Sequence, residues 1–191
     1  MENNQKNINE TQKATPDSLS TNEDASTSST FAAENITSGT YKIAVPEEGG
    51  MVEGKVVDFG AAGREQPLLW RDHKGLNQRW EFKYDAGKDA YQIINKADGR
   101  ILAYNTTYGT DYTALVTENQ HKPEHYWHLE DAGDGKVYLV NNEGFYRWEK
   151  KALTYSPNAQ KYDTPSHIFP LYVLPLKKED TQKFKLVKEN I

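Results

Sequence analysis

The sequence predicts an all-β fold made of three copies of one unit, and two observations support this. After Thr40 the chain consists of short apolar segments separated by Gly, Asn, Asp and Pro, with no long stripe of helical period. The opening segment also recurs, beginning at Tyr41, Tyr91 and Val137. Three units of about 45 residues, each with about four short strands, would close into a pseudo-threefold barrel without free edges.

Each unit also ends on a strand centred on one aromatic residue. These residues are Trp80, Trp127 and Phe184. A large ring at the same position of every repeat buries much apolar area when the three rings meet near the axis of a barrel. We therefore expect these rings to form the core and to specify the fold rather than a binding site.

The N-terminal segment has a different composition. Residues 1–30 contain no aromatic residue and are rich in Ser, Thr, Asn, Gln and Glu. Such a segment buries too little apolar surface to offset its ordering entropy. We expect a disordered tail over residues 1–37 and a single domain over residues 38–191.

The composition narrows the possible partners. The chain has no cysteine, a formal net charge of -5 and no cluster of Lys and Arg interleaved with aromatic residues. We therefore expect no disulfide, no cofactor and no nucleic-acid partner. No run reaches the roughly 18 apolar residues of a membrane span, and no signal peptide is visible. We expect no membrane insertion, and a secreted or extracellular protein exported by a non-classical route.

Two short motifs add a resemblance to a known family. Gln78-Arg79-Trp80 resembles the Gln-x-Trp signature of ricin-type β-trefoil lectins, and Gln182-Lys183-Phe184 resembles a variant of it. The similarity covers about residues 41–187. It implies a β-trefoil that binds glycans or glycoproteins, with a preference for galactose or N-acetylgalactosamine. Residues 169–186 are also similar to the small trefoil haemagglutinin of clostridial neurotoxin complexes, which implies other toxin-complex chains as partners.

The resemblance also implies a sugar site in the first repeat. A sugar offers an apolar face that stacks on an aromatic ring, and hydroxyls that bond carboxylates and amides. The implied roles are hydroxyl-binding carboxylate for Asp58, stacking platform for Trp70, side-chain hydrogen bond for Asn77, support of Asp58 for Gln78, and rim of the site for His73. Core packing alone does not require this combination.

Departures from the family pattern make the other repeats weaker candidates. In the first repeat, Leu68 stands where the family often places a polar residue. In the second, residues 103–105 (Ala-Tyr-Asn) provide no aspartate, and His125 replaces the glutamine of the motif. We expect the second repeat to be silent or altered.

The third repeat is a candidate for a second, degenerate site. It retains Gln182, and Tyr172 lies near the position of the stacking aromatic. However, residues 145–148 (Phe-Tyr-Arg-Trp) supply no carboxylate at the expected strand end.

No catalytic constellation is visible. The sequence lacks Gly-x-Ser-x-Gly, a phosphate-cradling loop and His-Glu-x-x-His, so we expect no catalytic residue. The spacing of His121, His125 and His128 suggests metal ligands, but a strand would send the last two to opposite faces. We expect surface or rim histidines and no metal site.

Two alternatives to a lectin remain open. The chain could be a trefoil protease inhibitor acting through the long Pro-flanked loop 154–165, or a scaffold in a toxin complex that has lost its sugar site. The combination of Asp58, Trp70, Asn77 and Gln78 favours the lectin.

Overall fold

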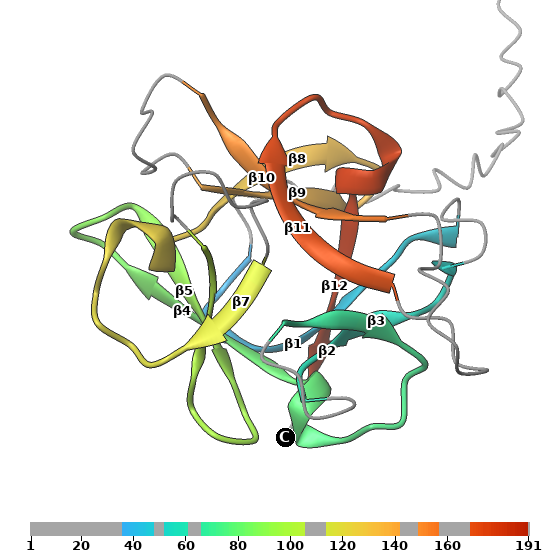
Figure 1. The fold of residues 1–191 in the computed structure, drawn as a ribbon, viewed down its shortest axis with the longest axis horizontal. Helices are drawn as coiled ribbons and strands as arrows, with labels where there is room; N and C mark the ends of the chain where they lie inside the picture. Colours follow the sequence, from blue (N-terminus) through green and yellow to red (C-terminus); the bar gives the residue numbers. More distant parts are fainter. Residues whose placement is uncertain are drawn as a thin grey trace, which may run out of the picture.

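The computed structural model describes residues 36–47, 52–60, 66–105, 114–141, 149–156 and 169–190. Within them the chain forms strands and short 3-10 turns that repeat three times around a pseudo-threefold axis (Figure 1). The strands of the first repeat are β1 (Gly39–Ala44), β2 (Val56–Asp58), β3 (Leu68–Trp70) and β4 (Trp80–Asp85). Those of the second are β5 (Ala90–Asn95), β6 (Ile101–Tyr104), β7 (Ala114–Thr117) and β8 (His128–Gly133). Those of the third are β9 (Lys136–Asn141), β10 (Lys151–Tyr155), β11 (Phe169–Pro175) and β12 (Phe184–Glu189).

The first and fourth strands of each repeat form the barrel. Antiparallel pairs join β1 to β4, β4 to β5, β8 to β9, β9 to β12 and β12 to β1. A bridge between Tyr91 and Trp127 completes the ring between β5 and the segment entering β8. The second and third strands of each repeat form hairpins, β2–β3, β6–β7 and β10–β11. This is the all-β trefoil that the repeats predicted.

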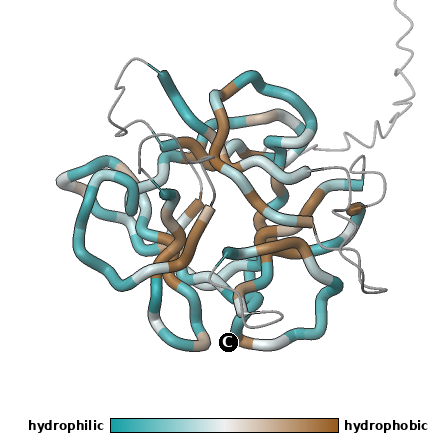
Figure 2. The backbone as a smooth tube through the Cα atoms, in the orientation of Figure 1, coloured by the Kyte–Doolittle hydropathy of each residue, from teal (hydrophilic) through white to brown (hydrophobic). Residues whose placement is uncertain are grey.

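The three aromatic rings occupy the core, as expected. Trp80, Trp127 and Phe184 are completely buried. Each indole N–H also donates to the carbonyl of a second strand, at 3.0 Å from Trp80 to Val57 and at 2.9 Å from Trp127 to Leu102. Hydrophobic segments gather toward the middle of the molecule and hydrophilic loops lie outside (Figure 2).

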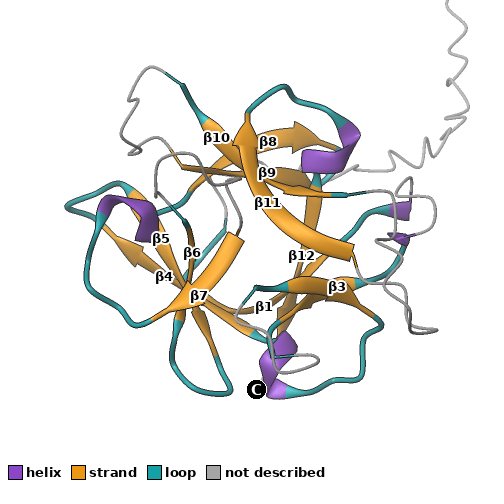
Figure 3. Cartoon of the chain, in the orientation of Figure 1, coloured by secondary structure: helices purple, strands orange, loops and turns teal. Residues whose placement is uncertain are grey.

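A short 3-10 turn precedes the fourth strand in every repeat (Figure 3). These turns are η4 (Leu76–Gln78), η5 (Pro123–His125) and η6 (Asp180–Gln182). Just before each lies a non-glycine residue with left-handed backbone: Lys74 (φ 62°), His121 (φ 53°) and Lys178 (φ 60°). An unfavourable backbone angle kept in all three repeats shows that the three loops have one shape.

The two described residues before Ser38 pack against the barrel. Ile36 is only 7% exposed and belongs to the core, and its carbonyl accepts a 2.6 Å hydrogen bond from the Tyr91 hydroxyl. The Thr37 carbonyl accepts a 2.8 Å bond from Tyr41. Ile36 and Thr37, which we expected in the tail, therefore contact the barrel; residues 1–35 of the expected tail lie outside the described part. No helix among the described residues is long and apolar enough to cross a membrane.

A candidate binding site in the first repeat

The hairpin β2–β3 presents Asp58 and Trp70 on one face. Cross-strand pairs join Asp58 to Leu68 and Val56 to Trp70, so the four side chains share a face, opposite to that of Val57. Val57 turns into the core and is fully buried. Asp58 and Trp70 are thus diagonal neighbours, whose Cβ atoms in such a hairpin lie about 7–8 Å apart.

Three side chains converge on the Asp58 carboxylate. Gln78 Nε2 donates to Oδ2 at 2.7 Å and His73 Nε2 approaches the same oxygen at 3.0 Å. Asn77 Nδ2 donates to Oδ1 at 3.0 Å. The structure thus brings together the four polar residues that the sequence singled out. Donation by Gln78 to Asp58 is the supporting contact that the resemblance implied.

Gln78 is wholly occupied in shaping the loop between β3 and η4. Its Oε1 accepts the backbone N–H of His73 at 2.9 Å. Its Nε2 donates to the Arg71 carbonyl at 2.8 Å as well as to Asp58. Because Gln78 is fully buried, it positions the loop and has no atom left for a ligand.

His73 is held in one tautomer over Asp58. The backbone N–H of Gly75 donates to His73 Nδ1 at 3.2 Å, so in the neutral ring the proton lies on Nε2 and points at Asp58. Gly75 makes this possible: a Cβ there would lie 2.5 Å from both Asn77 Oδ1 and His73 Cε1. The sequence analysis missed Gly75; a glycine two residues from polar side chains on both sides was the available signal.

The side-chain oxygen of Asn77 is available as a hydrogen-bond acceptor. One Nδ2 hydrogen goes to Asp58 and the other to the Phe59 carbonyl, at 3.0 Å each. Within the described residues Oδ1 has no hydrogen-bond donor, and Asn77 is only partly buried. Asn77 can therefore accept a hydrogen bond from a ligand hydroxyl, but it has no N–H left to donate.

A network of charged side chains also holds the loop between β3 and η4 in place. Lys42 Nζ lies 2.9 Å from Asp72 Oδ2 and 3.4 Å from Glu189, while the buried Arg79 lies 3.5 Å from Asp72. Burial alone would raise the pKa of Asp72, but hydrogen bonds from Lys42 and the Lys74 backbone, and the charges of Lys42 and Arg79, hold that pKa below its usual value. Asp72 therefore stays ionised and ties the loop to β1 and β12.

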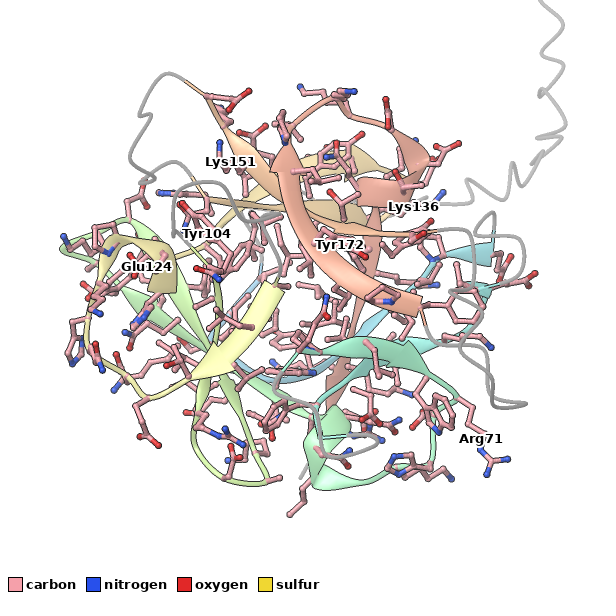
Figure 4. The ribbon with its side chains drawn as sticks, viewed as in Figure 1. Arg71, Tyr104, Glu124, Lys136, Lys151 and Tyr172 are labelled. Carbon is pink, nitrogen blue, oxygen red and sulfur yellow. The ribbon has the colours of Figure 1, made fainter. Side chains whose placement is uncertain are left out.

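The closed arrangement limits access to Asp58. The Asp58 side chain is 0% exposed, whereas the His73 side chain that covers it is 42% exposed. A ligand hydroxyl can reach Oδ2 only if the His73 ring turns outward. Leu68 is buried on this face and adds no polar group, as its sequence suggested. Arg71 points away from the molecule at the edge of the loop (Figure 4).

The second repeat has different residues at the positions of Asp58, Trp70 and Gln78. Ala103 pairs with Leu115 as Asp58 pairs with Leu68, and Thr117 occupies the position of Trp70. His125, in the place of Gln78, is buried, and its Nδ1 accepts the Gln120 N–H at 3.4 Å. The expectation of a surface or rim histidine is wrong for His125, because it replaces a residue that shapes the loop from inside.

The third repeat has the same loop but different chemistry. Gln182 Oε1 accepts the Lys177 N–H at 2.9 Å, and Nε2 donates to the Pro175 carbonyl at 2.9 Å and to Thr154 Oγ1 at 3.1 Å. Thr154 is therefore the counterpart of Asp58. Residues 145–148, where the sequence analysis placed that position, lie outside the described residues.

Of the two second-site candidates, Gln182 holds the position of the motif glutamine that the resemblance implied, whereas Tyr172 does not hold the position of the stacking aromatic. Tyr172 (Figure 4) pairs with Thr154 and so matches Leu68, while Leu174, 37% exposed, matches Trp70. Gln182 is buried with its side-chain atoms engaged in the loop, so it offers nothing to a ligand. Of the proposed inhibitor loop, residues 154–156 are described and the rest lies outside the described part.

The histidines do not form a metal centre in the described part of the chain. No group of three or more His, Cys, Asp or Glu side chains there could hold a metal ion. His121 Nδ1 instead lies 3.2 Å from the Tyr126 hydroxyl, on the second-repeat loop.

Comparison with known proteins agrees with this architecture. Residues 76–148 match the model of the ricin-type beta-trefoil lectin domain-like family. The structure is similar to the ricin B-like lectin of Macrolepiota procera in complex with lactose, with a TM-score of 0.58, 18% identity and coverage of 81% of this chain and 99% of the lectin. It is also similar to SeviL bound to asialo-GM1 saccharide, with a TM-score of 0.57, 17% identity and coverage of 81% and 100%.

One further neighbour is much larger than this chain. A mosquitocidal holotoxin matches with a TM-score of 0.66 and 20% identity, over 81% of this chain but 18% of the toxin chain. No curated protein matches the sequence. At these identities the structural neighbours establish the fold.

Proposed function

We propose that this chain, in which residues 76–148 match the model of the ricin-type beta-trefoil lectin domain-like family, functions in non-catalytic carbohydrate binding, directed at galactose or N-acetylgalactosamine groups of glycans and glycoproteins. One observation carries the proposal. Asp58 and Trp70 share one face of a hairpin, with Asn77 and His73 bonded to Asp58, and this set occurs in the first repeat but not at the described equivalent positions of the other two.

The side chains suggest how a sugar is held. The half-buried Trp70 ring stacks against the apolar face of the pyranose. One sugar hydroxyl donates to Asn77 Oδ1, and a second takes the place of the His73 Nε2–H on Asp58 Oδ2. His73 therefore competes with the ligand for Asp58, and Gln78 and Asp72 hold the loop in position.

The choice of sugar rests on two of the structural neighbours. One was solved with lactose and another with asialo-GM1 saccharide. Those ligands belong to the neighbours, but they support a galactose-type ligand for a chain with the same fold. We also propose an extracellular location and, as a further setting, association with other chains of a toxin complex. A single shallow site has millimolar affinity, about 4 kcal/mol, so several copies would be needed for firm attachment.

The test is titration of the full chain with lactose and N-acetylgalactosamine, followed by tryptophan fluorescence and paired with thermal melts. We expect Trp70→Ala to remove detectable binding while shifting the melting temperature by a few degrees at most, because the residue is only partly buried. The matched control is Leu174→Ala, which truncates the equivalent position of the third repeat and should bind normally. A wild-type protein that ignores both sugars, or a Trp70→Ala variant that still binds, would contradict the proposal.

A further inference from the structure

A separate hollow lies between the first and second repeats. It has a volume of about 600 Å³ and is formed where the start of β1, the β4–β5 hairpin and the start of β8 meet. Its lining includes Ser38, Tyr84, Asp89, Tyr91, His128 and Leu129. None of these belongs to the Asp58 cluster. The volume is in the range of pockets that hold small ligands.

Two tyrosine rings provide an apolar surface in the hollow. Tyr84 is 43% exposed, and its ring centroid lies 5.2 Å from that of Tyr91 at an interplanar angle of 56°. The Tyr91 hydroxyl is bonded to the Ile36 carbonyl at 2.6 Å. Because the rings pack against each other, the exposed surface of Tyr84 is the platform left for a ligand.

Polar groups surround this platform. The Tyr84 hydroxyl donates to Asp89 Oδ1 at 2.6 Å, which fixes the ring against the hairpin turn. Within the described residues Tyr84 is the only hydrogen-bond donor to the Asp89 carboxylate, and the His128 imidazole has no hydrogen-bond partner. An aromatic platform with a carboxylate acceptor and an imidazole beside it offers a pyranose both a stacking surface and bonds for adjacent hydroxyls.

We propose that this hollow is a second saccharide-binding site, in which the apolar face of a pyranose lies on Tyr84 and its hydroxyls bond Asp89 and His128. The site goes beyond the proposed function of the first repeat, since it uses none of the same residues. An organic cation is the competing ligand, because tyrosine rings and a carboxylate also attract ammonium groups. The saccharide is favoured because the paired rings leave one platform rather than enclosing a cation.

The test is a two-dimensional NMR titration of the isotope-labelled full chain with galactose, glucose, N-acetylglucosamine and choline, each added separately. We expect a sugar to shift the backbone signals of residues 84–91 with a saturating, millimolar-range response. Tyr84→Ala should remove that response, and Asp89→Asn should weaken it about tenfold through loss of the charged acceptor. Asparagine tolerates the left-handed angle of Asp89 (φ 50°), so the turn should survive. Lys83→Ala, an exposed neighbour on the other face of β4, is the control and should respond as wild type.

The Trp70→Ala background separates the two sites. The response at residues 84–91 should persist there, even if lactose binding at Asp58 is absent altogether. Loss of the response in that background would show that it reports the Asp58 site from a distance, and would overturn the inference. Shifts produced by choline but by no sugar, no shift with any sugar, or an undiminished response in Tyr84→Ala would also overturn it.

Discussion

The first and third repeats share the shape of one loop and differ in the side chains around it. In both, a buried glutamine, Gln78 or Gln182, ties the loop after the third strand to the second strand. At the end of that second strand the first repeat has Asp58 and the third has Thr154. Opposite, Trp70 of the first repeat becomes Leu174. The glutamine of the motif therefore shapes the loop, whereas the acid and the aromatic are the residues that we propose bind the ligand.

The largest effect should come from a position that all three repeats share. Trp127 is completely buried and its indole bonds the Leu102 carbonyl, so Trp127→Ala should lower the free energy of unfolding by about 3–5 kcal/mol. Urea denaturation followed by circular dichroism measures this change. Near-native stability would mean that the core rings of the repeats are not equivalent.

The two glutamines offer a more direct test of the comparison. Gln78→Ala and Gln182→Ala each leave partly buried backbone groups unpaired and should each cost about 1–3 kcal/mol of stability. Only Gln78→Ala should also weaken lactose binding, because Asp58 and the neighbouring Asn77 then lose their alignment. Equal losses of binding in the two variants, measured by fluorescence titration, would remove the distinction between the repeats.

His125 of the second repeat should make the stability of the folded protein depend on pH. Burial lowers the pKa of His125, with the charges of Lys122 and His121 acting in the same direction and Glu124 opposing them. A lowered pKa in the folded state means that the unfolded chain binds the proton more readily. The stability that the neutral ring contributes is present above its unfolded pKa of about 6.5 and is lost as pH falls through the folded pKa.

The measurement is the melting temperature of wild type and of His125→Gln, which restores the glutamine of the other repeats, across that pH range. The wild type should lose more stability than the variant on acidification. Parallel curves would show that His125 does not contribute to the pH dependence.

The smallest effect concerns the His73 ring over Asp58. His73 is largely exposed, so His73→Ala should change stability by no more than about 0.5 kcal/mol. Because the ring competes with ligand hydroxyls for Asp58, binding of lactose should stay the same or tighten, up to about tenfold. Calorimetric titration with lactose measures this affinity. A clear loss of affinity would show that His73 contacts the sugar instead.

Much of the fold could be predicted because repetition is visible in the sequence. The openings at Tyr41, Tyr91 and Val137 and the rings that close each unit correspond to equivalent strands. In the third repeat the counterpart of Asp58 was sought at residues 145–148, although Thr154 follows Val137 at the same spacing as Asp58 follows Tyr41, because a threonine does not mark the position as an aspartate does. A two-residue difference in register likewise separates Tyr172 from Leu174.

The residues around Asp58 could be predicted from the sequence, but the way in which they cover Asp58 and bond to it could not. Nothing in the order of residues shows that His73 covers Asp58, because that depends on Gly75 allowing two side chains to approach each other. The Asp72 network was also missed, since Lys42 and Glu189 come from the two ends of the domain.

The left-handed residues at Lys74, His121 and Lys178 have a consequence for the number of ligands the module can bind. Backbone geometry of this kind is hard to acquire by single substitutions, whereas an aspartate or a tryptophan at an existing position is not. The third repeat already has the turn and its glutamine, so it differs from the first in side chains rather than in the shape of this loop. If the proposed function holds, the number of sugars that the domain binds can therefore change through side-chain substitutions alone, on an unchanged backbone.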